Sequence, residues 1–130
     1  MFLKLSHTKL NIYSISRKFV VESYRITNHL PNQERFGMTS QIRRAALSVH
    51  LNISEGASRK SSKERKRFYE ISRGSLIEID AALDVANDLG YLESYDMNPL
   101  GSAMIETFKL LSGLIKVCED NREYAVVSRQ

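Results

Sequence analysis

The sequence predicts an all-α protein, folded as an antiparallel, up-down-up-down four-helix bundle. Four segments repeat apolar residues every three to four positions, which is the period of an amphipathic helix, and no segment shows the alternation of a strand. The segments are comparable in length and their connections are short, which favours antiparallel neighbours. The 130 residues suffice for one domain with a real core. We therefore expect one bundle domain over residues 1–120 and a loose C-terminal tail over 121–130.

The first two helices are predicted from their apolar stripes and their ends. The first is expected to begin with Asn11 as its N-cap and to stop before Pro31. The second is expected over residues 40–56, with Gly56 as its C-terminal glycine. The predicted core residues are Ile12, Ile15, Phe19 and Ile26 in the first helix, and Ile42, Ala46, Val49 and Ile53 in the second.

The third helix is expected over residues 62–89 and to be the longest of the four. Ser61 followed by Glu64 is a capping box, and Gly90 marks the end. At about 1.5 Å per residue this helix would span about 40 Å, against roughly 25 Å for the second, so its start should project from the bundle as an exposed tip. The predicted inner face comprises Phe68, Ile71, Ser75, Ile79, Ala82 and Ala86.

The fourth helix is expected over residues 95–119, with regular helix from Pro99. Its stripe comprises Met104, Phe108, Leu111, Ile115 and Cys118. Glycines also occur inside the helices, and each costs about 1 kcal/mol relative to alanine. We expect tight packing at such positions, within the bundle or against another subunit; they include Gly74, Gly101 and Gly113.

Several classes of protein do not fit the composition. No window approaches the roughly 18 apolar residues of a membrane span, and the N-terminus lacks the pattern of a secretory signal. The single cysteine, Cys118, fits a reducing compartment, so we expect a cytoplasmic protein. The three histidines and Cys118 have no metal-ligand spacing, and no glycine-rich phosphate loop is present. We expect no metal, no cofactor and no catalytic residues.

The charge is distributed unevenly along the chain, whose net charge is +4. Residues 1–34 carry five basic and two acidic side chains, residues 35–73 ten and three, and residues 74–130 four and ten. Residues 57–67, ASRKSSKERKR, hold six cations against the single acid Glu64. Such asymmetry indicates contact with nucleic acid or head-to-tail self-association.

Several motifs occur in a recognisable order. They are SQIRRAA at Ser40–Ala46, NISEG at Asn52–Gly56, the basic run at Arg59–Arg67, GSLIE at Gly74–Glu78 and LGYL at Leu89–Leu92. With them the chain resembles the 23S rRNA intervening-sequence protein family, also called the four-helix bundle protein family, from about residue 11 to 118.

The resemblance implies an antiparallel four-helix bundle that assembles into a ring-like homopentamer and has no catalytic activity. Some members are encoded within insertions in ribosomal RNA genes, and related accessory proteins of retroelements bind nucleic acid and a reverse transcriptase. Many members have a proline where this chain has His50. An unkinked second helix is therefore expected here, and the role of His50 stays open.

The basic run is the main candidate site. The helix dipole disfavours cations at a helix start, yet the third helix begins with four of them. Cations together with free N–H groups at a helix start form an anion site. No aromatic residue interrupts the run, so RNA or DNA would bind through phosphate, without base stacking. The predicted contacts are Arg59, Lys60, Lys63, Arg65, Lys66 and Arg67, with Arg43, Arg44 and Arg73 as secondary contacts.

Four other interpretations remain open. The basic run can be a solvated turn, or it can meet the acidic C-terminal half of a neighbouring subunit in a scaffold with no nucleic-acid role. The secondary arginines can pair with carboxylates such as Glu55, Glu70 or Glu78. Finally, Arg44 and His50 fit the loose R-x(4–6)-H pattern of HEPN ribonucleases, a pattern that chance alone produces about as often as not.

Overall fold

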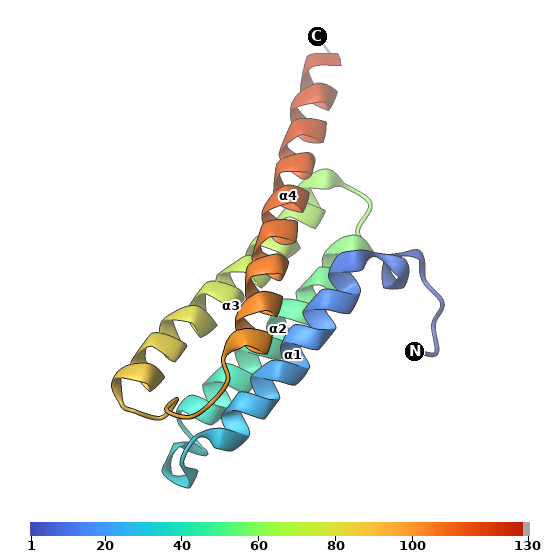
Figure 1. The fold of residues 1–130 in the computed structure, drawn as a ribbon. Helices are drawn as coiled ribbons and strands as arrows, with labels where there is room; N and C mark the ends of the chain where they lie inside the picture. Colours follow the sequence, from blue (N-terminus) through green and yellow to red (C-terminus); the bar gives the residue numbers. More distant parts are fainter. Residues whose placement is uncertain (129–130) are drawn as a thin grey trace.

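The computed structural model describes the backbone of residues 1–128 and the side chains of residues 1–121. Its main elements are α1 (Asn11–His29), α2 (Met38–Ala57), α3 (Ser62–Asp88) and α4 (Asn98–Ser128), with two short 3-10 turns, η1 (Ser6–Lys9) and η2 (Asn32–Glu34). Every regular element in this part of the chain is helical (Figure 1). The predicted all-α four-helix bundle is confirmed.

Successive helices run in opposite directions in Figure 1. Each helix contacts two others: α1 and α3 both contact α2 and α4, while the diagonal pairs make no contact. We call the end where α2 leads into α3 the upper end, as drawn, and the end that holds the α1–α2 and α3–α4 connections the lower end. The start of α1 also lies at the upper end, so residues 57–67 share it with the N-terminal segment.

The core is formed largely by the residues expected in α1 and α2. The predicted stripe of α2 is buried throughout, and in α1 only Ile15 is not fully buried. In α3 the prediction is confirmed for Ile79 and Ala86 and wrong by one position at the other four residues, of which Ile71 is 43% exposed. Apolar side chains lie on two adjacent stripes of this helix, so the period alone does not select one. The buried residues of α3 are Tyr69, Ser72, Leu76, Ile79, Leu83 and Ala86.

The fourth helix differs most from the prediction. It comprises 31 residues against 27 in α3, so α4 and not α3 is the longest. The loose tail expected from residue 121 is instead helical to Ser128, while residues 129–130 lie outside the described part. No proline or glycine follows Gly113, so nothing in the sequence stops the helix. Phe108, expected in the core, is 40% exposed.

The long α4 changes the surroundings of the α3 start. In Figure 1, α4 extends past α3 at the upper end. Lys66 in the second turn of α3 pairs with Glu119 of α4 at 3.2 Å. The first turns of α3 therefore lie beside α4 and do not project alone from the bundle.

Two of the predicted helix ends are confirmed. Glu64 N–H donates to Ser61 Oγ at 3.1 Å, as a capping box requires. Gly90 has φ +78°, its N–H donates to the carbonyl of Asn87, and Tyr91 N–H donates to the carbonyl of Ala86. This pair of bonds is a Schellman motif, which ends α3.

Two other ends were predicted wrongly. The N-cap of α1 is Leu10, without a side-chain cap, and Asn11 is already helical. Gly56 is inside α2 and does not follow its end. A Cβ at Gly56 would lie 2.8 Å from Cε1 of Tyr69, so the glycine allows α2 and the start of α3 to approach closely.

Candidate nucleic-acid interface

The basic run forms a short, internally bonded turn at the upper end, between the last residues of α2 and the first turns of α3. Ser58 N–H donates to the carbonyls of Ser54 and Glu55, and Arg59 N–H donates to that of Gly56. We call residues 57–67 the basic turn. Its backbone is thus fixed on both sides, by the end of α2 and by the capping box of α3.

Arg65 is directed back into the turn. Its Nη1 donates to the carbonyl oxygens of Arg59 at 3.0 Å and Lys60 at 2.7 Å, and its Nη2 donates to Ser62 Oγ at 3.1 Å. The guanidinium thus binds carbonyl oxygens between α2 and α3 that neither helix pairs. Arg65 is therefore a structural brace of the basic turn.

Arg59 and Lys66 are also engaged within the subunit. Arg59 Nη2 pairs with Glu55 at 3.0 Å, as the i,i+4 spacing predicted, and its guanidinium lies 4.9 Å from the ring centre of Phe68. Lys66 Nζ lies 3.6 Å from Glu70 and 3.2 Å from Glu119. Half of the six predicted contacts thus have partners in their own chain.

The other three cations are the exposed trio: Lys60, Lys63 and Arg67. All three are exposed, and none forms a hydrogen bond or an ion pair with a side chain in the described part of the molecule. Lys63 and Arg67 line a shallow depression together with Lys66, Glu70 and Ile71. The start of α3 therefore presents cations to solvent where the helix dipole adds further positive potential.

The secondary arginines do not extend this surface. Arg43 donates from Nε to Thr27 Oγ1 and from Nη2 to Asn28 Oδ1, both at 2.8 Å, and lies 4.9 Å from the ring centre of Tyr24. Arg73 Nη1 donates to Ser112 Oγ at 3.3 Å. Neither pairs with a described carboxylate, so the expected pairing with Glu55, Glu70 or Glu78 does not occur for these two.

A second basic surface lies near the lower end; the sequence analysis named two of its arginines, Arg43 and Arg44, but missed Arg35 and Phe36. A hollow there is lined by residues of α1, the α1–α2 connection and the first half of α2, and we call it the arginine hollow. It includes the exposed Arg44. Its lining residues are Tyr24, Arg35, Phe36, Thr39, Ser40, Arg43, Arg44 and Leu47. The signal that could have indicated it is the pair Arg35-Phe36, an aromatic residue next to a cation. The pair lies in the connection between two helices, where a search for helical periodicity gives no information.

His50 lies on the side of α2 that faces α1. Its Nδ1 is 2.7 Å from Ser16 Oγ, and its ring centre is 4.7 Å from that of Tyr13. Burial lowers the pKa of His50 below its usual 6.5, and the nearby Arg17 and His7 lower it further. The residue thus acts as a neutral packing group between the two helices.

Arg44 borders two depressions, the arginine hollow and a second one beside α3. Residues of α3, Ser75 and Glu78, line the second, whereas His50 contacts α1. Among the described residues, no hydrogen bond or shared hollow joins the two side chains. The geometry gives no support to the HEPN interpretation. No group of His, Cys, Asp and Glu in the described residues could hold a metal ion.

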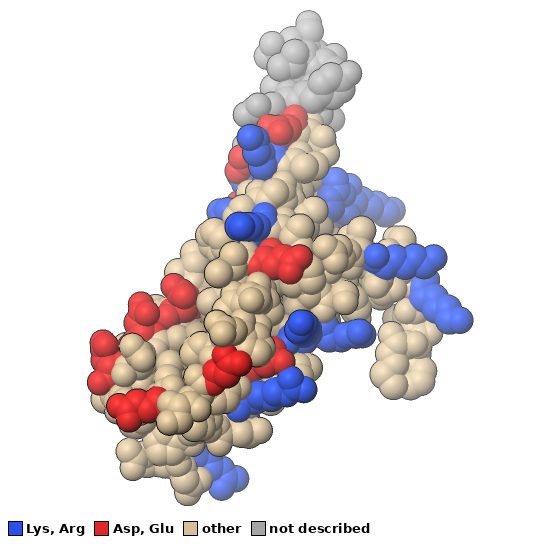
Figure 2. All heavy atoms as spheres, in the orientation of Figure 1, with Lys and Arg blue, Asp and Glu red and all other residues tan. Residues whose placement is uncertain are grey.

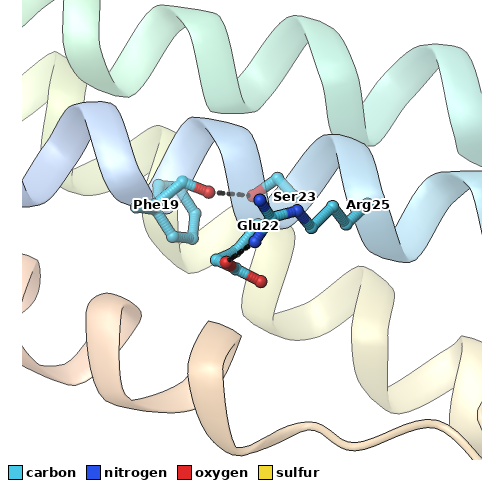
Figure 3. A network of polar contacts seen from close by, with 4 residues as sticks. All are labelled: Phe19, Glu22, Ser23 and Arg25. Carbon is cyan, nitrogen blue, oxygen red and sulfur yellow. Dashed lines mark hydrogen bonds and ion pairs between the residues drawn. The ribbon is translucent and has the colours of Figure 1, made fainter.

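A buried carboxylate on α1 is also accounted for. Glu22 is buried and accepts a hydrogen bond from Nη1 of Arg25, one turn further along the helix (Figure 3). The neighbouring Ser23 Oγ donates to the carbonyl of Phe19 at 2.9 Å. These polar groups satisfy one another within α1, so they form no reactive site.

The acidic residues gather away from the basic turn. Figure 2 shows red groups over the lower part of α3, and most blue groups at the upper end and on the α1 side. We call this acidic surface the acidic flank, and it holds Asp80, Asp84 and Asp88 at i,i+4 spacing on α3. None of the described helices combines the length and the apolar character that a membrane crossing requires.

Comparison with known proteins agrees with this architecture. The family model of the 23S rRNA-intervening sequence protein matches residues 8–113, which include all of α1, α2 and α3 and half of α4. No curated protein matches the chain. Because the matched segment covers well over half of the sequence, the chain belongs to the 23S rRNA-intervening sequence protein family.

Proposed function

We propose that this protein is a non-enzymatic, homo-oligomeric bundle that binds RNA or DNA through phosphate contacts at the basic turn. The exposed trio carries this proposal, because these three cations lie in the basic turn and form no hydrogen bond or ion pair with a described side chain, although the guanidinium of Arg67 lies 6.0 Å from the ring centre of Phe68. Arginine and lysine at a helix start attract phosphate by charge and through the free N–H groups of the first turn. No aromatic side chain interrupts the basic run to stack on a base, so binding should depend little on the nucleotide sequence.

Binding of this kind has a characteristic salt dependence. Each phosphate that a cation neutralises releases counterions, and the logarithm of affinity falls with the logarithm of salt with a slope of about −0.9 per contact on duplex DNA. Three exposed cations per subunit would give a slope of about −3 for each subunit engaged. An oligomer that presents several turns to one strand would therefore bind tightly only at low salt.

The test reverses charge at two of the three cations. Lys63→Glu with Arg67→Glu should weaken binding of a random-sequence duplex and lower the magnitude of the salt slope by about 2 per engaged subunit, measured by filter binding across a salt series. Lys18→Glu with Lys116→Glu is the matched control, because it changes the net charge equally at exposed positions outside the basic turn. Equal loss in both variants would reduce the effect to net charge and reject the site.

We infer self-association through an exposed apolar surface on α3 and α4. The two helices enclose a groove of about 280 Å³, and it is lined by Leu76, Ile77, Asp80, Met104, Ile105, Phe108 and Lys109. Gly74, Gly101 and Gly113 lie on the same two helices, and a Cβ at any of them would meet nothing within 4 Å. Packing inside the subunit therefore does not require these glycines, which supports packing against a second copy.

The alternative is a scaffold that binds no nucleic acid. In that case the basic turn would meet the acidic flank of a neighbouring copy. The ratio of absorbance at 260 and 280 nm, measured on the protein purified at low salt and again after high salt, separates the two. Protein that is already free of nucleic acid at low salt, and that binds no duplex when one is added, would favour the scaffold.

A further inference from the structure

The arginine hollow carries an inference that rests on the proposed function and makes it more specific. Phe36 is 89% exposed, and among the described large hydrophobic side chains only Met1 is more exposed. We propose that the arginine hollow binds single-stranded nucleic acid, with one nucleobase stacked on Phe36 and the adjoining phosphates held by Arg35 and Arg44.

The ring of Phe36 is presented by a fixed backbone. Arg35 N–H donates to the carbonyl of Asn32 at 3.1 Å, Gly37 N–H donates to that of Glu34 at 3.0 Å, and Gln41 N–H donates to that of Gly37 at 3.0 Å. The connection between α1 and α2 is thus bonded on both sides of Phe36. Little backbone entropy is therefore lost when a base stacks on the ring.

The charges around the ring suit a phosphodiester. Three arginines line the hollow, and no carboxylate does. Arg43 is already fixed by Thr27 and Asn28, which leaves the exposed Arg35 and Arg44 for phosphate. The guanidinium of Arg35 lies 5.3 Å from the ring centre of Phe36, so a base on the ring would have a cation beside it.

Polar groups lie next to the hollow; Thr27 and Asn28 are already bonded to Arg43, and Asn32 is the exposed side chain that can hydrogen-bond a base. An adjoining depression shares Arg35, Thr39 and Arg43 with it and is also lined by Thr27, Asn28 and Asn32. The nearest acid along the chain, Glu34, lines neither depression. Its carboxylate lies toward Gly37, where an added Cβ would be 3.4 Å from Oε1.

This chemistry favours a single strand over a duplex. Bases in a duplex are stacked on one another, whereas unpaired bases are free to stack on an aromatic side chain. The hollow is also separate from the basic turn, because Arg44 and Ala57 are about 20 Å apart along α2 at 1.5 Å per residue. One subunit can therefore hold phosphate at the basic turn and a base at Phe36.

The chain contains no tryptophan, so Phe36→Trp creates a single fluorescent reporter at the hollow. Stacking on an oligothymidylate should quench its emission in a saturable way. An abasic oligomer of the same length, which has the phosphates but no bases, should quench it little. Equal quenching by the two oligomers, or none by either, would overturn the proposal.

Removal of the Phe36 ring measures how much base stacking contributes to the affinity for single strands. Phe36→Ala should weaken binding of the oligothymidylate roughly 5- to 150-fold, the range expected for one stacked base. Binding of a duplex should stay unchanged. Phe2→Ala is the matched control, because Phe2 is 86% exposed but is not among the residues that line the hollow. An equal loss for Phe2→Ala, or no loss for Phe36→Ala, would contradict stacking at this site.

The same experiments separate this inference from the proposed function. If duplex binding persists and depends on Lys63 and Arg67 while Phe36→Trp reports no stacking, only the stacking site fails. If stacking occurs but charge reversal at Lys63 and Arg67 has no effect on duplex binding, the basic turn fails. A change of Phe36→Trp emission with protein concentration alone would assign the hollow to a second copy and overturn the proposal.

Discussion

Gly56 is the glycine of this chain with the least room for a side chain. Because a Cβ there would lie 2.8 Å from Cε1 and 3.0 Å from Cδ1 of Tyr69, any larger residue forces the ring or the helix to move. This contact fixes the angle at which the chain leaves α2 and enters the basic turn. The NISEG motif thus ends in glycine for a steric reason, and not for the helix ending that the sequence analysis expected.

We expect Gly56→Ala to lower the free energy of unfolding by up to about 2 kcal/mol. Overpacking costs about 1–3 kcal/mol, and the better helix propensity of alanine returns about 1 kcal/mol of it. Chemical denaturation measures the change. Gly74→Ala is the control, because a Cβ there meets nothing within 4 Å, and it should be neutral or stabilising. A Gly56→Ala protein as stable as the wild type would show that the ring yields without cost.

His50 should make stability depend on pH. Its pKa is lowered in the folded protein by burial and by Arg17 and His7, so below pH 6.5 the unfolded chain takes up the proton first. Stability is therefore fully present above pH 6.5 and falls as the pH drops below it. His50→Gln keeps a polar partner for Ser16 without a titrating ring.

Thermal unfolding at pH 7.5 and pH 5.5 tests this. The decrease in Tm between the two pH values should be smaller for His50→Gln than for the wild type. The test compares the decrease in Tm of the wild type with the decrease in Tm of the variant. Absolute Tm values are not compared, because the substitution also changes packing at both pH values. Equal decreases would show that other groups cause the pH dependence.

At the scale of the elements, the local signals in the sequence were sufficient for the buried stripe of α2 and for both ends of α3. The capping box at Ser61 and the glycine at Gly90 act within a few residues, so their outcome does not depend on the rest of the fold. The face of α3 is different. Ile71 and Ile77 are apolar but exposed, and the positions of α2 and α4 together decide which stripe is covered.

In the candidate site too, some features follow from the local sequence and others depend on how the helices pack. Composition alone indicates the basic turn, but it does not indicate that Arg65 donates to two backbone carbonyls or that Lys66 reaches Glu119. Those partners depend on the path of the turn and on the length of α4. Phe36 was missed because it lies in a connection and comes together with Tyr24 and Arg44 only when α1 and α2 pack.

At the scale of the whole molecule, the exposed apolar groove between α3 and α4 leads to a prediction about assembly. Ile77→Glu with Ile105→Glu should reduce the mass measured by light scattering to that of a smaller species, since charges in an apolar interface are not solvated. Leu47→Glu with Leu51→Glu is the control, because these leucines are exposed on α2 and do not line that groove.

Two results would contradict this prediction. A wild-type protein that is monomeric at all concentrations would exclude self-association. An unchanged mass for the groove variant, together with dissociation of the α2 variant, would move the interface to the other side of the bundle. The resemblance to ring-forming relatives implies five subunits, and the same measurement on the wild type gives the number.

The separation of the basic turn from the acidic flank also bears on how an encounter begins. The exposed trio at the upper end and the carboxylates along the lower part of α3 contribute an electric dipole along the bundle, which the arginines of the hollow near the lower end reduce. The field of a polyanion exerts a torque on such a dipole and turns the basic turn toward the nucleic acid before contact. This orientation raises the association rate, and the gain fades as added salt shortens the range of the field from about 10 Å at 0.1 M to about 3 Å at 1 M.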